Sequence, residues 1–188
     1  MQRKTHAAIL RTTRKIHRVL GVFLFAFFIL VAVTAVLLGW KKNSDGVLLP
    51  HTLESLVSDP GKPIGIDSVQ YLAVRALEQE HPRVSPAIDR LDVRPEKGVV
   101  KVTFQEHYWE VQIDLYSGAV LQIAKRRSDF IENLHDGSIF DKYFQTDGDS
   151  IKLLYTSLMG LSLLTFSITG FWLWYGPKVM RRHTDKQP

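Results

Sequence analysis

Two histidines, His17 and His135, are the residues of this chain best placed to do chemistry at a membrane. His17 lies at the start of a long apolar run, and His135 lies in Leu134-His135-Asp136-Gly137, shortly before a second run. Imidazole is an axial ligand of haem iron, and it exchanges protons near neutral pH. At a membrane surface the same side chain also contacts lipid headgroups or helix carbonyls, and in a loop it can hold a turn. The residues leave both roles open for each histidine.

The two histidines cannot bind one iron within a single chain if the apolar runs span a membrane. His17 then lies at the inner surface and His135 on the outer side, with about 30 Å of hydrocarbon between them. A haem would need His17 paired with His183, or the same histidine from two chains. The chain has no cysteine, which excludes thioether-linked haem, iron–sulfur clusters and thiol catalysis. We therefore predict no cofactor, with haem b as the alternative, and no catalytic or metal-ligating residue.

The apolar runs extend from Val19 to Trp40 and from Leu153 to Gly176, and neither contains a charged side chain. A helix needs about 20 such residues to cross a bilayer, and within lipid it satisfies its own backbone amides. A cleaved signal peptide is the alternative for the first run. Signal peptides have a shorter apolar core of about 7–15 residues, and here Lys41 and Lys42 follow the run. We expect two transmembrane helices.

Charge predicts the orientation of these helices. Both outer flanks are basic, whereas the section 41–152 is mildly acidic. Short basic flanks stay in the cytoplasm, so both termini are expected inside a bacterial inner membrane and the central section in the periplasm. The overall charge of +5 then comes from tails that lie against anionic lipid, and it does not indicate nucleic-acid binding. The expected partners are the bilayer and either a protein partner or a second copy of the chain.

Helical spacing predicts how the two spans pack. Small side chains let helix backbones approach closely in lipid, and each span has a face that carries them. On the first span, this face comprises His17, Gly21, Phe25, Phe28, Ala32, Ala35 and Gly39. On the second, it comprises Thr156, Gly160, Leu163, Ser167, Gly170 and Trp174. The two faces predict a tight helical hairpin.

The central section combines one helical pattern with several strand patterns. Val69, Leu72, Ala73, Ala76 and Leu77 repeat at helical spacing. Apolar residues then alternate with polar ones in four short segments separated by turns. Predicted core and turn residues are Trp109, Val111, Ile113, Asp114 and Gly118. The fold class is therefore α+β, with two transmembrane helices flanking an extracytoplasmic domain of one amphipathic helix packed on an antiparallel sheet of about four strands.

These patterns divide the chain into consecutive segments. They are a basic cytoplasmic segment (1–18), the first transmembrane helix (19–40), a connector (41–64), the external domain (65–125), an interfacial segment (126–151), the second transmembrane helix (152–176) and a basic tail (177–188).

Four motifs in this order resemble a known family. The strand ending in Asp114, with Gly118 four residues later, resembles the PepSY domain. Arg14-Lys-Ile-His17-Arg-Val-Leu-Gly21 is similar to the start of PepSY-associated transmembrane helices. Asn133-Leu-His135-Asp-Gly137 and Thr169-Gly170-Phe-Trp172-Leu-Trp174 are similar to later pieces of that family. The resemblance covers roughly residues 14–176.

The resemblance implies binding or regulation rather than catalysis, because soluble PepSY domains resemble the inhibitory parts of protease propeptides. Some larger relatives, with four or more spans, are inner-membrane reductases of ferric siderophores that use haem. We therefore expect a non-enzymatic binding, regulatory or accessory subunit at the outer face of the inner membrane. The alternative is a haem-binding electron-transfer subunit of the ferric-reductase type.

Overall fold

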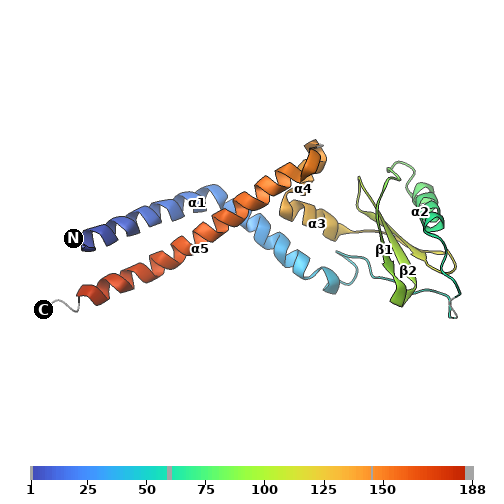
Figure 1. The fold of residues 1–188 in the computed structure, drawn as a ribbon, viewed down its shortest axis with the longest axis horizontal. Helices are drawn as coiled ribbons and strands as arrows, with labels where there is room; N and C mark the ends of the chain where they lie inside the picture. Colours follow the sequence, from blue (N-terminus) through green and yellow to red (C-terminus); the bar gives the residue numbers. More distant parts are fainter. Residues whose placement is uncertain (1, 59–60, 145, 185–188) are drawn as a thin grey trace. The chain divides into compact units, whose positions relative to one another are not determined.

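The computed structural model describes residues 2–58, 61–144 and 146–184, and among them all side chains except those of 2–4, 147 and 181–184. Its architecture is α+β, as predicted (Figure 1). The chain forms two compact units. We call Met1–Val33 with His135–Pro188 the helical unit, and Thr34–Leu134 the sheet unit. The side chain of His183, one of the potential haem partners, lies outside the described residues.

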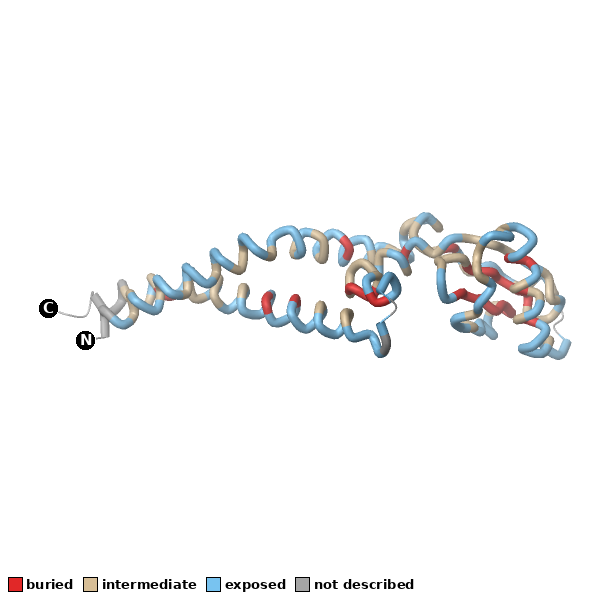
Figure 2. Tube along the Cα trace, turned by 90° about the horizontal axis from the view of Figure 1, so that it is seen from above, coloured by how far each residue is buried: buried red, intermediate tan, exposed pale blue. Residues whose placement is uncertain are grey.

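The helical unit contains most of the helix α1 (Gln2–Gly39), the short helices α4 (Ser138–Phe144) and η3 (Asp147–Asp149), and the helix α5 (Ser150–Thr184). Two stretches, Thr5–Gly39 and Ser150–Met180, are long and apolar enough to cross a membrane. At about 1.5 Å per residue, the 38 residues of α1 extend over about 57 Å, more than a bilayer requires. Few side chains along these helices are buried (Figure 2).

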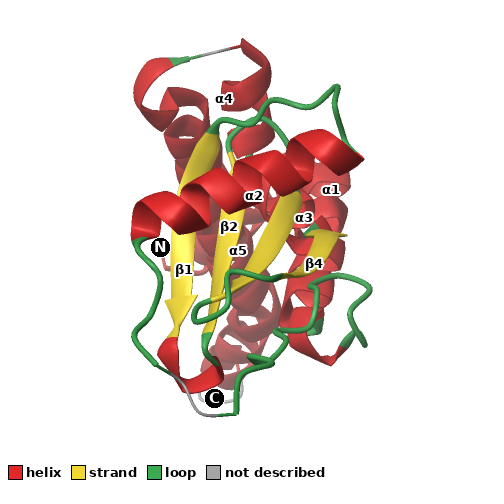
Figure 3. Cartoon of the chain, turned by 90° about the vertical axis from the view of Figure 1, so that its right-hand side faces the viewer, coloured by secondary structure: helices red, strands yellow, loops and turns green. Residues whose placement is uncertain are grey.

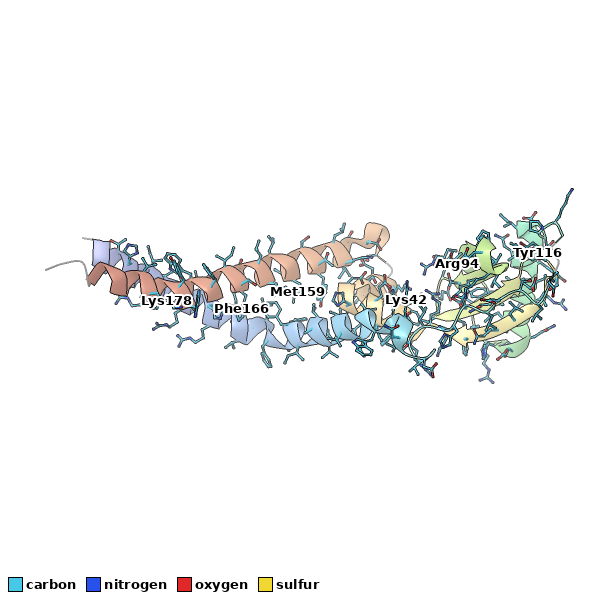
Figure 4. All side chains as sticks on the ribbon, turned by 90° about the horizontal axis from the view of Figure 1, so that it is seen from below. Lys42, Arg94, Tyr116, Met159, Phe166 and Lys178 are labelled. Atoms are coloured by element: carbon cyan, nitrogen blue, oxygen red, sulfur yellow. The ribbon has the colours of Figure 1, made fainter. Side chains whose placement is uncertain are left out.

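Large side chains of α5 make its contacts with α1. The ring of Phe166 lies 3.9 Å from that of His17 and 5.7 Å from that of Phe28, and Tyr155 lies 6.4 Å from Phe27. Met159, labelled with Phe166 in Figure 4, is 8% exposed. The α5 contact face therefore includes aromatic and thioether groups as well as glycine.

The predicted α5 face is wrong in register by one residue. Thr156, Gly160, Leu163, Ser167 and Trp174 are exposed, and their preceding neighbours, such as Met159 and Phe166, are more buried. One residue is about 100° of rotation around a helix. A transmembrane helix is apolar on every side, so its hydrophobic pattern does not indicate which face meets a neighbour. Gly170 does face α1, with a Cβ position 3.4 Å from His17 Cε1.

On α1, the residues of the predicted packing face that contact α5 are His17, Gly21 and Phe28, whereas Phe25 is 59% exposed. A Cβ at Gly21 would lie 3.2 Å from the ring of Phe166. Farther along, Ala32, Ala35 and Gly39 are exposed, and no atom lies within 4 Å of a Cβ at Gly39. Ala35 and Gly39 belong to the sheet unit, so the packing face within the helical unit ends before them.

Gly160 and Gly170 both belong to the predicted packing face, but only Gly170 contacts α1. We expect Gly170→Leu to destabilise the helix pair by about 1–3 kcal/mol, because the new side chain overpacks against His17. Gly160→Leu is the matched control, because nothing lies within 4 Å of its Cβ position, and we expect a change of less than about 0.5 kcal/mol. Thermal unfolding in detergent measures both. Equal losses for the two variants would contradict the observed packing.

The sheet unit is an antiparallel sheet in the order β1-β2-β3-β4, with helix α2 (Ile66–Glu80) across one face (Figure 3). The strands are β1 (Ile88–Arg94), β2 (Val99–Phe104), β3 (Trp109–Asp114) and β4 (Val120–Lys125). Short helices η1 (Lys41–Asn43) and η2 (Pro95–Lys97) lie in the connections, and α3 (Arg127–Asp136) follows β4. The core is made by Val69, Ala73, Ala76, Leu77, Val100, Val102, Phe104, Val111 and Ile113. Trp109, predicted as core, is partly buried at its edge.

The opposite face of the sheet is also covered, although its side chains are polar. Lys101, Thr103, Glu110, Gln112 and Asp114 are each no more than 6% exposed. The connector covers them: the amide of Leu53 donates to Gln112 Oε1 (3.0 Å), and Gln112 Nε2 donates to the carbonyl of His51 (2.8 Å). Side-chain hydrogen bonds to the connector's backbone thus replace a second apolar layer.

Candidate functional site

His17 is held between α1 and α5 of the helical unit. Its Nδ1 lies 2.9 Å from the hydroxyl of Thr169, and its ring stacks on Phe166 at an interplanar angle of 23°. The Thr169 hydroxyl donates to the carbonyl of Thr165 (2.7 Å), so its oxygen accepts a hydrogen bond from the N–H at Nδ1 of His17. This assignment leaves Nε2 of the neutral ring as an acceptor. Such a nitrogen can take up a proton or ligate a metal.

The segment around His135 ends α3 and leads into α4, and it contacts the N-terminal part of α5. Asp136 accepts hydrogen bonds from the amide and hydroxyl of Ser138 and forms an ion pair with Lys152 (2.9 Å). Gly137 has φ +80°, and a Cβ there would lie 2.7 Å from Tyr155, so glycine is required both for the backbone conformation and for the contact. The Asp136-Gly137 part of the motif therefore has a structural role.

Asp141 caps the start of α5. Its carboxylate accepts hydrogen bonds from the amides of Ile151 (3.0 Å) and Lys152 (2.7 Å) and from the hydroxyl of Thr146. Burial raises the pKa of Asp141, but these hydrogen bonds outweigh it and lower the pKa. The charge also complements the positive end of the helix dipole. The Asp141 carboxylate therefore has a structural role as the cap of α5.

The structure does not bring His17 and His135 together. His17 lies beside Thr169, whereas the residue after His135 pairs with Lys152 near the other end of α5. At about 1.5 Å per residue, Lys152 and Thr169 are about 25 Å apart along the helix. One chain cannot place both imidazoles on one iron.

A buried ionic cluster, which we call the Glu110 cluster, lies on the connector side of the sheet. Glu110 is 1% exposed, receives a hydrogen bond from Arg126, and lies 3.6 Å from Lys101 Nζ. Burial lowers the pKa of Lys101, and Glu110 opposes this shift. Arg126 also contacts Asp129 at 2.7 Å. Arg126 begins the segment predicted to be interfacial, but its side chain turns inward, because Glu110 and Asp129 compensate its desolvation.

Asp114 fastens the connector to the turn after β3. Its Oδ1 accepts hydrogen bonds from the amides of Tyr116 (2.9 Å) and Ser117 (3.0 Å). Its Oδ2 accepts from the hydroxyl of Ser55 and the amide of Leu56, both at 2.8 Å. Burial raises the pKa of Asp114, but these four bonds outweigh it and lower the pKa to about 2. The carboxylate is saturated and fully buried, which leaves it no role as an acid or base.

Gly118 completes this turn. Its φ of +73° favours glycine, and a Cβ would lie 3.0 Å from Leu72 Cδ1 of α2. The predicted turn position and the core helix are therefore in contact.

A groove of about 480 Å³ lies along β4 in the sheet unit. Its lining comprises Asp45, Gly46, Val47, Pro50, His51, Gln122, Ala124, Lys125 and Arg127. Lys125 Nζ lies 5.3 Å from the ring centre of Trp109, and Arg127 donates to the carbonyl of Val47 (3.0 Å). His51 lies 3.4 Å from Asp45. No sequence motif indicated this groove, because connector and strand residues distant along the chain build it together.

The arrangement of two apolar helices and a PepSY-like sheet unit agrees with a comparison against known families. The family model of the PepSY-associated TM region matches residues 11–187. The chain belongs to the PepSY-associated TM family. It is thus a membrane protein whose long helices contact the lipid bilayer. A comparison with curated proteins finds no match.

In this PepSY-associated TM protein, each motif that carried the resemblance has a structural contact. Asp114 and Gly118 form the turn that joins connector, sheet and α2. Gly137 packs on Tyr155, and Gly170 on His17. The Glu110 cluster was missed, although opposite charges on adjacent strands, at Lys101 and Glu110, were a signal that could have indicated it.

Proposed function

We propose that this chain is a non-enzymatic binding or accessory subunit, anchored in a membrane by its two long helices and using its PepSY-like sheet unit to hold a partner protein. The observation that supports this proposal is that the buried or partly buried acidic side chains have structural partners, so they are not free to act as catalytic acids or bases. Asp114, Glu110, Asp136 and Asp141 are each engaged in hydrogen bonds or ion pairs that build the fold. The groove along β4, by contrast, is open to a ligand.

The proposed location is a bacterial inner membrane with both termini in the cytoplasm and the sheet unit in the periplasm. Basic residues flank both apolar helices on the proposed cytoplasmic side, and there Lys178 lies 3.6 Å from the ring centre of Trp174. Aromatic rings and cations of this kind are typical of membrane interfaces. Reporter fusions after residue 90 and at the C-terminus test the topology. If both fusions report the same compartment, the two-span arrangement is incorrect.

Site-directed photo-crosslinking in native membranes tests the binding function. We expect a discrete crosslinked protein when the photoreactive residue lies on the sheet unit, and none when it replaces exposed Leu158 of α5. Sheet-unit positions that yield no crosslink in cells producing the intact protein would remove the proposal.

A second candidate function is haem-dependent electron transfer, and the His17 geometry favours it. The hydrogen bond from Nδ1 to Thr169 orients the ring as outer hydrogen bonds orient haem-ligating histidines, with Nε2 available. Bound haem would supply one-electron chemistry. His17 would supply one ligand, so a second would have to come from His183 or from His17 of another copy. In this alternative, Nε2 of His17 would hold the haem iron, and Phe166, stacked on the imidazole, would help to orient the ring.

Absorption spectroscopy separates the two functions. We expect the purified, reduced protein to lack haem bands. His17→Ala should then weaken helix packing without a spectral change, because it removes the contacts to Thr169 and Phe166. His81→Ala is the matched control, since that imidazole lies in the sheet unit, stacked on Trp109. A bis-histidine spectrum that His17→Ala abolishes and His81→Ala preserves would replace the binding function with electron transfer.

A further inference from the structure

The outer edge of β4 carries backbone groups that point away from the sheet. β4 is the last strand in the sheet order, and the amide of Arg126 donates to the carbonyl of Tyr108 (2.7 Å) at the end of the β3–β4 ladder. In an antiparallel ladder, alternate residues direct both backbone groups to the partner. Ala124 therefore faces β3 as Arg126 does, and the intervening Ile123 and Lys125 face outward. Among the described residues, no other segment makes a backbone hydrogen bond to these two.

The two edges of the sheet differ in their protection. β1 has four charged residues, Asp89, Arg90, Asp92 and Arg94, and an irregular register between Ile88 and Arg90. Charges and bulges are the devices by which proteins prevent further strands from adding to an edge. β4 reads Val-Leu-Gln-Ile-Ala-Lys, with a single charge at its end. The β4 edge is therefore the one able to accept a strand.

The groove lies along this unprotected edge and has a basic rim. Lys125 and Arg127 lack an acidic partner among the described residues, whereas the one acid of the lining, Asp45, lies beside His51. The ring of Trp109 adds apolar surface next to Lys125. An extended segment with acidic side chains matches both features, because its backbone can pair with β4 while a carboxylate meets the two cations.

We propose that the β4 edge binds an extended acidic peptide segment of the partner protein by strand addition, with acidic side chains directed at Lys125 and Arg127. Strand addition derives affinity from main-chain hydrogen bonds and specificity from alternate side chains. This proposal rests on the binding function above and names the site and the chemistry of its partner.

The first test uses the full-length protein in phosphatidylcholine nanodiscs and a fluorescent eight-residue peptide of alternating valine and glutamate. Fluorescence anisotropy should show saturable binding that weakens with salt, and a valine–lysine peptide should bind at least tenfold more weakly. In an added strand, only alternate amides face β4. N-methylation of one alternate set should abolish binding, and methylation of the other should preserve it. Equal effects of the two sets would overturn strand addition.

Protein variants test the position. Ile123→Pro removes an outward amide and should weaken peptide binding at least tenfold, whereas Val93→Pro on β1 is the matched control and should leave it unchanged. Urea unfolding of both variants shows whether the sheet persists. Lys125→Glu and Arg127→Glu, which keep the backbone, should each weaken binding at least fivefold, against no change for Arg83→Glu, a matched charge reversal on the loop after α2. Binding unaffected by either Glu substitution would place the peptide elsewhere.

Photo-crosslinking distinguishes failure of this site from failure of the binding function. Partner crosslinks from Val47 and Val120, with none from Glu78 of α2, support the β4 site. Crosslinks from Glu78 alone keep the binding function and overturn the β4 site. Crosslinks between two copies through Val120 identify self-association of β4 edges and also overturn the peptide proposal. Absence of crosslinks from all three positions removes the site and leaves the binding function without support.

Discussion

Replacing Glu110 by alanine should destabilise the sheet unit by about 3–5 kcal/mol, because it leaves buried cations without their compensating charge. Lys101 Nζ lies 3.6 Å from Glu110, and its side chain is 5% exposed. Arg126 keeps its ion pair with Asp129, so most of the lost stability comes from the unpaired charge of Lys101. Hydrogen exchange of the amides in 99–114, measured by mass spectrometry on the full-length protein in micelles, reports the loss.

Two controls separate charge from packing. Glu78→Ala, on the exposed side of α2, should change the free energy of opening by less than about 0.5 kcal/mol. The triple variant Lys101→Met, Glu110→Leu, Arg126→Met should recover most of the stability, because well-packed apolar groups often replace a buried ion cluster without loss. If the Glu110→Ala variant is as stable as the native protein, the buried cations do not need the Glu110 carboxylate for the stability of the sheet unit.

The Glu110→Ala variant should also regain stability as the pH rises. Burial holds the pKa of Lys101 below that of the unfolded chain, and removing Glu110 removes the interaction that raises it. The unfolded state then binds more protons than the folded state, so stability increases with pH through the interval between the two pKa values. A loss independent of pH would assign the effect to packing instead.

Replacing Asp114 by asparagine should destabilise the sheet unit by about 2–4 kcal/mol. Two donors converge on each carboxylate oxygen, and an asparagine side chain has only one acceptor oxygen. Its amide group would face two donors, leaving buried groups unsatisfied at a cost of about 1–3 kcal/mol each. Exchange of amides around Leu56 should rise together with that of β3, because Asp114 holds both segments. Protection lost in β3 alone would contradict that coupling.

The Asp114 carboxylate also predicts acid sensitivity. Its folded pKa of about 2 lies below the value of about 3.9 in unfolded chains. Its contribution, about 2.5 kcal/mol, is present above pH 4 and is lost as the pH falls through about 2. Urea unfolding across this range should show a smaller acid loss for Asp114→Asn than for the native protein. Asp89→Asn, at an exposed ion pair, is the control and should keep the native acid profile.

Local patterns were sufficient for several parts of this protein. The two apolar runs predicted the long helices, because the length of an uncharged run is itself the physical requirement for crossing lipid. Alternation of apolar residues predicted four strands, and α2 followed from its helical spacing. Asp114 and Gly118 stood out as turn residues in the family resemblance, and the family comparison confirms that resemblance.

Contacts between distant segments were decided only by the tertiary structure. The sequence by itself determined that α1 and α5 are apolar, but lipid solvates every face of such a helix, so the partner of Phe166 was undetermined. Polar residues alternate with apolar ones on β2 and β3, yet the connector covers the polar face, because its backbone satisfies Gln112 and Asp114. The β4 groove likewise forms where the connector meets a strand that is distant along the chain. Hydrophobic periodicity encodes which residues avoid water, whereas the pairing of buried polar groups depends on which segments meet.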